Sequence, residues 1–499
     1  MSQDLYLSID VGTGSARAAL VDTRGTILAI VSREHEQIVQ QYGWAEQRPE
    51  DWWAGVIHAI RGLLDAHPYA RERIAAICAC GQMHGTVLID ADGQLTSPSV
   101  LLWNDKRTAS LVQAFEKNNR PEDYLSRSGN PPTPAWPAFK LQWLRDNEPD
   151  AYARTAAVMM PKDYINYRLT GEIAQDWTEA SCSFLMDPQT RDWSPQMLDR
   201  LGIRAEILPK IRSPQEILGS INAVAAQETG LAVGTPVLVG GGDYPVSLLG
   251  SGVCRPGLGS DVTGTSCIIT TIARQPLLDP EISNVACVSD WGPFVLLESG
   301  GDAMRWARRA FHENSLSYAD ISNRAAQAPA GSNGLLFAPY LSGERLGDHR
   351  NARAQFFGIA ANHGLAHLHR AVLEGVAFAA ARHIEIMQTA TGQPLQKVVA
   401  SGGGAKSALW LKIKASIYGI PIAVPEEAEC GVIGCAALAA AAVGHFSTPE
   451  DAAEHFVHYA DDVLPDPEWV EVYQRMQPIF NRLYLHSQQM YDDLDRLAL

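Results

Sequence analysis

The sequence predicts an α/β fold made of two related domains, in which helices cover mixed sheets. Strand-like segments alternate with segments of helical periodicity along the whole chain. The chain has 499 residues, which is too many for one ordinary core. A glycine-rich turn after an apolar strand occurs near the start of the chain and again near its middle. These three observations carry the prediction.

The first segments predict an antiparallel meander followed by a helix. Residues 5–10 lead into a turn at Gly12, and residues 16–22 and 26–34 have the pattern of two further strands. The segment "IAAICACGQ" is typical of a buried strand. Between these strands, one face of a helix that begins after Pro49 collects apolar side chains, namely Trp53, Val56, Ile57, Ile60, Leu63 and Leu64.

The first turn has a counterpart in the second half of the chain. "DVGTGS" begins at Asp10 and "DVTGTS" begins at Asp261, an offset of 251 residues. A duplicated nucleotide-binding module would leave such a pair, and two unrelated turns would explain it equally well. Long helices are expected at "LHRAVLEGVAFAAARHIEIMQ" and "GVIGCAALAAAAVG". We therefore expect domains at residues 1–246 and 247–499.

Composition argues against several classes of protein. The formal net charge is −16, so the surface should repel nucleic-acid phosphates. No apolar run is long enough for a bilayer span, and the first residues lack the features of a signal peptide, so a soluble cytoplasmic protein is expected. The 8 cysteines form no C-x-x-C pair and the 14 histidines no H-E-x-x-H motif, which predicts reduced core thiols and no protein-built metal centre.

The first glycine-rich turn differs from the two most familiar phosphate-binding motifs. A dinucleotide site needs a third glycine that opens a helix, but Arg17 stands there and a strand follows. A P-loop needs glycine before its Lys-Ser pair, whereas Ala405 precedes Lys406 and Ser407 in "SGGGAKSALW". What remains is a β-hairpin turn whose backbone N–H groups bind phosphate oxygens.

Such hairpin turns could act in pairs. Turns at Gly12 and Thr13 and at Thr263–Thr265 (Thr263, Gly264 and Thr265) could face each other and grip the β- and γ-phosphates of a nucleotide. Asp10, at the end of the preceding strand, is placed to hold Mg²⁺ through water. The sequence thus predicts a nucleotide phosphate site made of two turns.

The motifs together resemble the FGGY carbohydrate kinases, in the sugar-kinase branch of the actin/hexokinase/Hsp70 superfamily. The two turns and "SGGGAKS" fit that superfamily. "PAFKLQWLRDN", with Lys140 and Trp143, and "AQFFGIAANHGLAHLHRAVLE" resemble the two FGGY signatures. Within the family, "GWAEQRPEDWW", "GQMHGTVLID", "LLWNDKR", "VLVGGGDYP" and "YLSGER" are most similar to the pentulose kinases. The likeness runs from about Leu5 to Gly444.

The resemblance implies a fold, an activity and cofactors. The fold is two actin/hexokinase-like (ribonuclease H-like) domains around a deep cleft. The activity is transfer of phosphate from ATP, with Mg²⁺, to a small sugar, and D-xylulose is the expected acceptor. A kinase for ribulose or erythritol is the alternative, followed by a nucleotide-gated protein or a sugar-binding protein without catalysis. Partners are limited to sugar and ATP, and the oligomeric state, including a homodimer, stays open.

Asp243 is the candidate general base. It follows a strand and three glycines in "LVGGGDYPVS". A turn aspartate that caps the next helix would give the same pattern, and so would a carboxylate that accepts the proton of an attacking hydroxyl. The resemblance favours the base. Tyr244 follows Asp243, whereas asparagine is expected there in a pentulose kinase. This difference affects the expected identity of the sugar and leaves the expected phosphate transfer unchanged.

Two further motifs are candidates for the sugar site. Met83 and His84 follow the buried strand between two glycines, and the resemblance implies that they contact substrate. Trp103, Asn104 and Asp105 combine an apolar face, an amide and a carboxylate, which suits a sugar, although a turn with a buried tryptophan is the competing interpretation.

The remaining candidates concern the nucleotide. Arg17 follows the first turn and could equally be a solvated strand residue. A glycine run before a helix suits a phosphate or adenosine, and the resemblance implies an adenosine pocket there and near Glu429. Glu344 and Arg345 of "YLSGER" are left as structural or substrate-binding. The nucleotide candidates in this second stretch are Gly402, Gly403, Gly404, Lys406 and Ser407.

Overall fold

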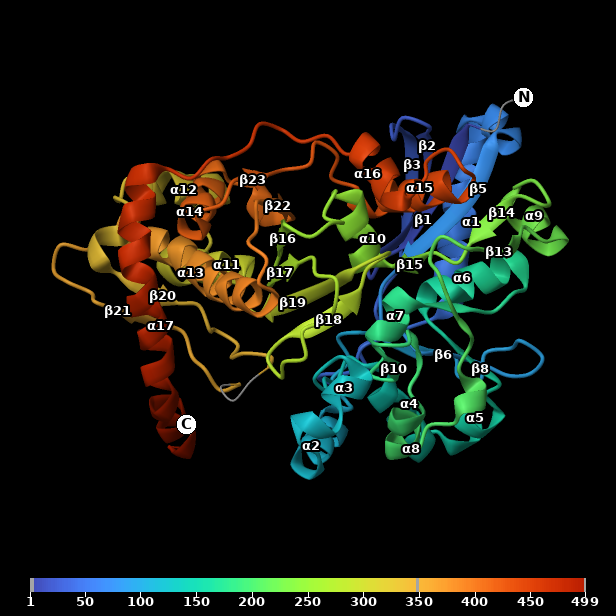
Figure 1. The fold of residues 1–499 in the computed structure, drawn as a ribbon, viewed down its shortest axis with the longest axis horizontal. Coiled ribbons are helices and arrows are strands. Elements are labelled where there is room, and N and C mark those ends of the chain that lie inside the picture. The colour runs from blue at the N-terminus through green and yellow to red at the C-terminus, as the bar shows by residue number, and fades with distance from the viewer. Residues whose placement is uncertain (1–3, 347–349, 498–499) are drawn as a thin grey trace. The chain divides into compact units, whose positions relative to one another are not determined.

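A computed structural model describes residues 4–346 and 350–497, and its packing divides the chain into two units (Figure 1). The first unit contains the residues up to Cys254 together with Ser283–Gly292 and Glu429–His458. The second contains Arg255–Ile282, Pro293–Ala428 and the residues from Tyr459 onward. The first unit is therefore discontinuous in sequence, and the division at residues 246 and 247 stays a prediction about sequence modules.

A seven-stranded mixed sheet forms the centre of the first unit. The predicted meander is confirmed, because β1 (Leu5–Val11), β2 (Ser15–Asp22) and β3 (Ile27–Glu34) pair antiparallel in that order. β5 (Ile74–Gly81) then lies parallel to β1, which requires the crossover helix α1 (Pro49–Ala66) that the apolar pattern predicts. The other strands of this sheet are β13 (Ile217–Ser220), β14 (Pro236–Leu238) and β15 (Gly241–Gly242).

Helices cover both faces of this sheet. Alternate side chains of β1, such as Leu7 and Ile9, belong to the same buried cluster as the apolar face of α1. Tyr6 points to the opposite face and packs in a second cluster with α15 (Cys430–Ala442) and α16 (Pro449–Phe456). Figure 1 shows these two C-terminal helices, in red, beside the blue N-terminal strands. Packing on both faces explains why β5 is an unbroken apolar run.

The second unit contains the repeat of the hairpin. β16 (Leu258–Thr263) pairs antiparallel with β17 (Cys267–Thr271) and parallel with β22 (Lys397–Ser401), as β1 does with β2 and β5. The sheet also includes β19 (Trp291–Leu297) and β23 (Ile422–Ala423). The two hairpins therefore occupy equivalent places in two related sheets, which supports duplication over a chance likeness of two turns.

Three helices form much of the core of the second unit. The predicted long helix is confirmed as α13 (Leu365–Thr391), and it packs with α14 (Ala408–Tyr418) and α17 (Pro467–Arg496). The smaller elements of this unit are α11 (Gly301–His312), α12 (Tyr318–Ala325), β20 (Leu336–Ala338) and β21 (Gln355–Phe357). Among the described residues, none of the helices has the length and apolar character needed to cross a membrane.

Short elements complete the first unit. Its further strands are β4 (Glu46–Gln47), β6 (Val87–Ile89), β7 (Val100–Leu101), β8 (Ala157–Met159), β9 (Gln175–Asp176), β10 (Met186–Asp187), β11 (Asp192–Trp193), β12 (Ile211–Arg212) and β18 (Ser283–Ala286). Its further helices are α2 (Ala109–Asn118), α3 (Leu125–Ser128), α4 (Pro137–Asn147), α5 (Pro149–Arg154), α6 (Pro161–Thr170), α7 (Trp177–Ser181), α8 (Pro195–Leu201), α9 (Ala223–Thr229) and α10 (Asp243–Gly250).

A buried histidine in α13 predicts that the fold loses stability in acid. Burial, with the nearby Arg382 cation, lowers the pKa of His383 to about 3. The unfolded chain takes up this proton near pH 6.5, as a free histidine does, so the free energy of unfolding falls as pH drops below that value. At pH 5 this histidine should lower the free energy of unfolding by about 2 kcal/mol relative to neutral pH. Urea unfolding at pH 7 and pH 5 should show a loss smaller by that amount in His383→Gln, and an equal loss in both proteins would contradict the prediction.

Candidate active site

Three parallel strands bring the two predicted catalytic carboxylates together. In the register of the first sheet, Asp10 of β1 and Gly241 of β15 both lie opposite Cys80 of β5. The carboxyl ends of the three strands therefore meet at one edge of the sheet, where ligands of α/β folds usually bind. Asp243, two residues beyond Gly241, lies at the same edge, and the charge of Asp10 raises its pKa.

Asp10 has one oxygen available for a ligand. Its Oδ2 lies 3.2 Å from Arg17 Nε, whereas no described residue donates a hydrogen bond to its buried Oδ1. Burial raises the pKa of Asp10, and the Arg17 guanidinium opposes this increase. A strand-end carboxylate with an unpaired oxygen fits the water shell of a hydrated Mg²⁺, so the residues present are suited to that ion.

Asp243 is the first residue of α10, and its approach to β5 requires glycine. Gly240 has φ +69°, and a Cβ there would lie 2.0 Å from the carbonyl oxygen of Ala79. Burial, followed by the charge of Asp10, raises the pKa of Asp243 to about 7. A carboxyl group that titrates near neutrality can both accept and release a proton, which is the property of a general base.

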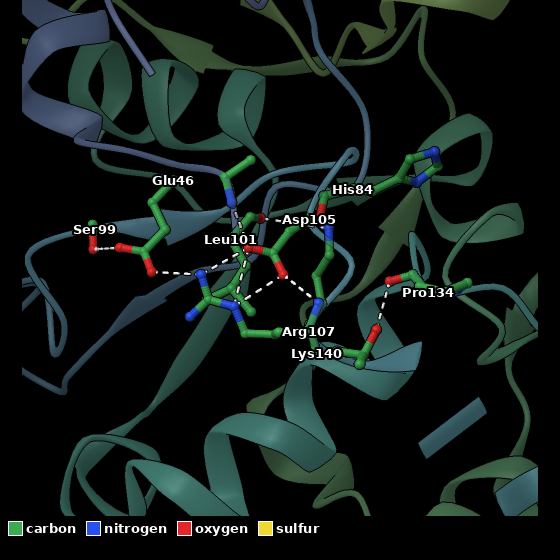
Figure 2. Close-up of polar contacts among 10 residues, drawn as sticks. Glu46, His84, Ser99, Leu101, Asp105, Arg107, Pro134 and Lys140 are labelled. Atoms are coloured by element: carbon green, nitrogen blue, oxygen red, sulfur yellow. Dashed lines mark hydrogen bonds and ion pairs between the residues drawn. The ribbon is translucent and has the colours of Figure 1, made fainter. Parts of the chain in front are cut away.

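Met83 lies beside the glycines that precede Asp243, and His84 follows it in the chain. A Cβ on Gly242 would lie 2.9 Å from Met83 Sδ, so "GQMHG" packs directly on "GGGD". His84 has φ +71°, which is strained for a residue other than glycine. Its carbonyl accepts a 2.6 Å hydrogen bond from Lys140 Nζ (Figure 2). Its ring packs edge-on against Trp136. Lys140, from the first FGGY signature, therefore holds a strained segment. Burial destabilises its charged form and lowers the pKa of Lys140 to about 7.

The "WND" residues have three different environments. Trp103 is 39% exposed, and its Nε1 donates to Thr13 Oγ1 at 3.0 Å, which links this loop to the first turn. Asn104 has a buried Oδ1 that receives no hydrogen bond from the described residues, so it can accept one from a ligand. Asp105 is buried. Both of its oxygens accept hydrogen bonds from Arg107, and Oδ2 also accepts one from the amide of Ala45 (Figure 2). Its carboxylate braces the loop and presents no unused oxygen.

Side chains that the sequence did not single out hold the first turn. Gln47 Nε2 donates to the Thr13 carbonyl at 2.7 Å, and His35 Nε2 lies 3.0 Å from the Gly12 carbonyl. Arg17, a candidate from the sequence on the strand after the turn, forms ion pairs with both Asp10 and Glu429. Gln47 and His35 lie 34 and 23 residues from their partners, so no local sequence pattern signals these contacts.

The nucleotide candidates of the second unit form a second cluster. A Cβ on Gly402 would lie 2.7 Å from the Thr263 carbonyl oxygen, so the "SGGG" segment packs on the second turn. Gly264 is exposed, and Thr265 Oγ1 accepts a hydrogen bond from Arg305 at 3.2 Å. Gly403, Gly404 and Lys406 form a 3₁₀ turn, and Ser407 then caps α14 through the amide of Trp410. Whether this turn faces Thr13 stays a prediction.

The repeat-related aspartates differ in their bonding. Lys414 Nζ donates to both oxygens of Asp261, at 2.9 and 2.8 Å, and Tyr418 adds a 2.8 Å hydrogen bond. Thr263 donates to the same carboxylate at 2.6 Å, so its hydroxyl is used inside the fold. Burial alone would raise the pKa of Asp261, but Lys414, Thr263 and Tyr418 together lower it. Asp10, with its unpaired oxygen, is therefore the metal candidate of the two.

Tyr244, Glu344 and Arg345 are the remaining residues of the sequence motifs. Tyr244 is half-buried in the first turn of α10. Glu344 accepts a hydrogen bond from Tyr484 of α17, and Arg345 Nε donates to Glu298 at 2.7 Å. Both residues of "YLSGER" therefore have structural partners within the second unit.

A duplicated α/β sheet, a turn after each first strand and two carboxylates at one sheet edge fit the class of α/β enzymes that transfer phosphate. The chain belongs to the FGGY family of carbohydrate kinases, whose N-terminal domain matches residues 5–250 and whose C-terminal domain matches residues 260–443. It is thus a sugar kinase with an actin/hexokinase-like fold.

Individual relatives cover almost the whole chain. A xylulose kinase of Bacillus subtilis is 30% identical over 97% of this chain and 97% of its own length. The solved xylulose kinase of Lactobacillus acidophilus superposes with a TM-score of 0.92 at 27% identity, and covers 98% of this chain and 99% of its own. An autoinducer-2 kinase of Escherichia coli is 31% identical over 97% of this chain and 94% of its own length.

Proposed function

We propose that this enzyme transfers the γ-phosphate of ATP to the terminal hydroxyl of D-xylulose, which gives D-xylulose 5-phosphate, with Asp243 as the general base. The unpaired oxygen of Asp10 beside a carboxyl group whose pKa is about 7 carries the proposal. The xylulose kinases among the similar proteins favour the pentulose.

The residues divide the work of the reaction. Asp243 accepts the proton of the sugar hydroxyl as its oxygen forms a bond to phosphorus and ADP leaves. Asp10 would hold hydrated Mg²⁺, which when bound neutralises charge on the phosphates. The amides of the two hairpin turns would bind phosphate oxygens. His84, Trp103 and Asn104 would orient the sugar, and orientation supplies much of the rate in phosphoryl transfer.

A second candidate is an acceptor other than D-xylulose. The autoinducer-2 kinase is as similar in sequence as the xylulose kinases, and a gluconate kinase of Lactobacillus acidophilus superposes with a TM-score of 0.92 at 27% identity. Tyr244 adjoins Asp243 and would narrow the sugar site more than the asparagine expected there. The substrate test therefore includes acceptors other than D-xylulose.

The test is a panel of acceptors in an ADP-coupled assay. D-Xylulose, D-ribulose, L-ribulose, erythritol and gluconate are compared by kcat/KM at saturating ATP and Mg²⁺. We expect D-xylulose to give the highest value, and a higher value for another acceptor would replace the proposed substrate without changing the assignment as a kinase. The same panel with Tyr244→Asn should show an altered ranking, and an unchanged ranking would remove Tyr244 from the sugar site.

His84 should affect the sugar and not the nucleotide. His84→Ala removes the ring that follows Met83 and packs on Trp136. It should raise the KM for sugar roughly 10-fold, the equivalent of one hydrogen bond in a desolvated pocket. The KM for ATP should stay within about 2-fold of wild type, since the turns are untouched. His58→Ala on the exposed face of α1 is the matched control. A change confined to the KM for ATP would contradict this role.

A further inference from the structure

A buried chain of polar groups ends at the backbone amide of Gly242, the residue before Asp243. The Thr178 hydroxyl, in α7, accepts a 2.9 Å hydrogen bond from the amide of Gly242. The same hydroxyl donates to Asp176 Oδ1 in a short hydrogen bond. Because a hydroxyl has one proton to donate, these two bonds fix its orientation and leave Thr178 as a connection between Asp176 and the backbone of the catalytic segment.

Asp176 is fixed in turn by a buried ion pair. Its Oδ2 lies 2.8 Å from Lys162 Nζ, and its Oδ1 also accepts the amides of Thr178 and Glu179 at the start of α7. The side chains of Lys162 and Asp176 are both 0% exposed, and Lys162 also pairs with Asp163. Buried ion pairs add little net stability to a fold, so stability alone explains this group poorly.

The segment that the chain holds has little rigidity of its own. Gly240, Gly241 and Gly242 have no side chains to pack, and glycine has the widest choice of backbone conformations. A Cβ on Gly241 would lie 3.0 Å from Thr178 Oγ1, so glycine at this position also permits the approach of Thr178. Asn166, on the same helix as Lys162, holds the preceding strand through a 2.8 Å hydrogen bond to the Val239 carbonyl.

We propose that Lys162, Asp176 and Thr178 are positioning residues that fix the direction of the Asp243 carboxylate through the Gly242 peptide. The proposal rests on the proposed role of Asp243 as the base. None of the three touches the reacting atoms, so their effect should appear in kcat and not in the binding of sugar or ATP.

The experiment compares Thr178→Val with Thr178→Ser. Valine keeps the shape and removes the hydroxyl, and serine keeps the hydroxyl. We expect Thr178→Val to lower kcat roughly 10–100-fold, as removal of a supporting partner of an active-site group commonly does. Both KM values should stay within about 2-fold, and Thr178→Ser should recover most of the lost kcat.

A double-mutant cycle separates positioning from general damage. In an Asp243→Asn background, Thr178→Val should cause little further loss of kcat, because the carboxylate that it orients is gone. Additive losses, or equal kcat values in the valine and serine variants, would overturn the proposal. If Thr178→Val does not fold, Asp176→Asn enters the same cycle with the same expectations. Near-normal turnover of Asp243→Asn itself would instead refute the base assignment.

Discussion

Replacement of Asp243 by asparagine should lower kcat by roughly 10²–10⁴-fold, the usual contribution of a positioned base. Asparagine keeps the shape of the side chain and can still form a hydrogen bond with the sugar hydroxyl, but it accepts no proton. Binding of sugar and ATP, measured by calorimetry, should therefore stay close to wild type. The loss would be larger if the carboxylate also orients the attacking oxygen.

Asp105→Asn is the matched control for this prediction. Asp105 is a second carboxylate near a sugar motif, but its oxygens are bonded to Arg107 and the Ala45 amide. Its amide variant should lose stability and some sugar affinity, because Arg107 is left without part of its buried counter-charge. Near-normal turnover in Asp243→Asn together with an inactive, folded Asp105→Asn would move the chemistry to the "WND" loop.

Replacement of Asp10 by asparagine should lower kcat by roughly 10²-fold or more, since a metal ion supplies several kcal/mol of charge stabilisation in such transfers. The variant should need more Mg²⁺ for half-maximal rate and should not regain the wild-type rate at saturation, because the charged oxygen that positions the ion is lost. Initial rates across a Mg²⁺ titration measure both effects. Unchanged turnover at saturating Mg²⁺ would refute this role.

The repeat supplies the control for Asp10. Asp261→Asn alters the equivalent carboxylate, which is bonded to Lys414 and Tyr418. We expect lower stability towards urea and an unchanged Mg²⁺ concentration at half-maximal rate. A shift in that concentration equal to the shift in Asp10→Asn would show that the two aspartates share the metal role.

The sequence predicted those features that depend on neighbours along the chain. The meander from β1 to β3, the helix after Pro49 and the long helix α13 follow from local periodicity, and the structure confirms them. The offset between Asp10 and Asp261 indicated a repeat, and the equivalent pairing of the two hairpins supports it. Local pattern also placed Asp243 directly after its strand and at the start of a helix.

The hydrogen bonds and burial of the site residues depend mostly on partners far away in the sequence and could not be predicted. Lys414 reaches Asp261 across 153 residues, and Lys140 reaches the His84 carbonyl across 56. The pairing of Asp105 with Arg107 is local, yet burial is what makes it an ion pair without an unused oxygen. The return of α15 to the first sheet is likewise a packing effect, because its apolar surface covers β1 and β5.

The unequal bonding of Asp10 and Asp261 has a consequence for how a duplicated protein becomes an enzyme. Two identical halves would offer a divalent cation two equivalent carboxylates. Lys414 takes the place of a cation at Asp261, so one ancestral position carries a permanent internal charge while the other keeps its carboxylate oxygen. If Asp10 holds Mg²⁺ as proposed, this difference leaves one of the two repeat-related aspartates open to a divalent cation, because the charge of the other is already neutralised inside the fold.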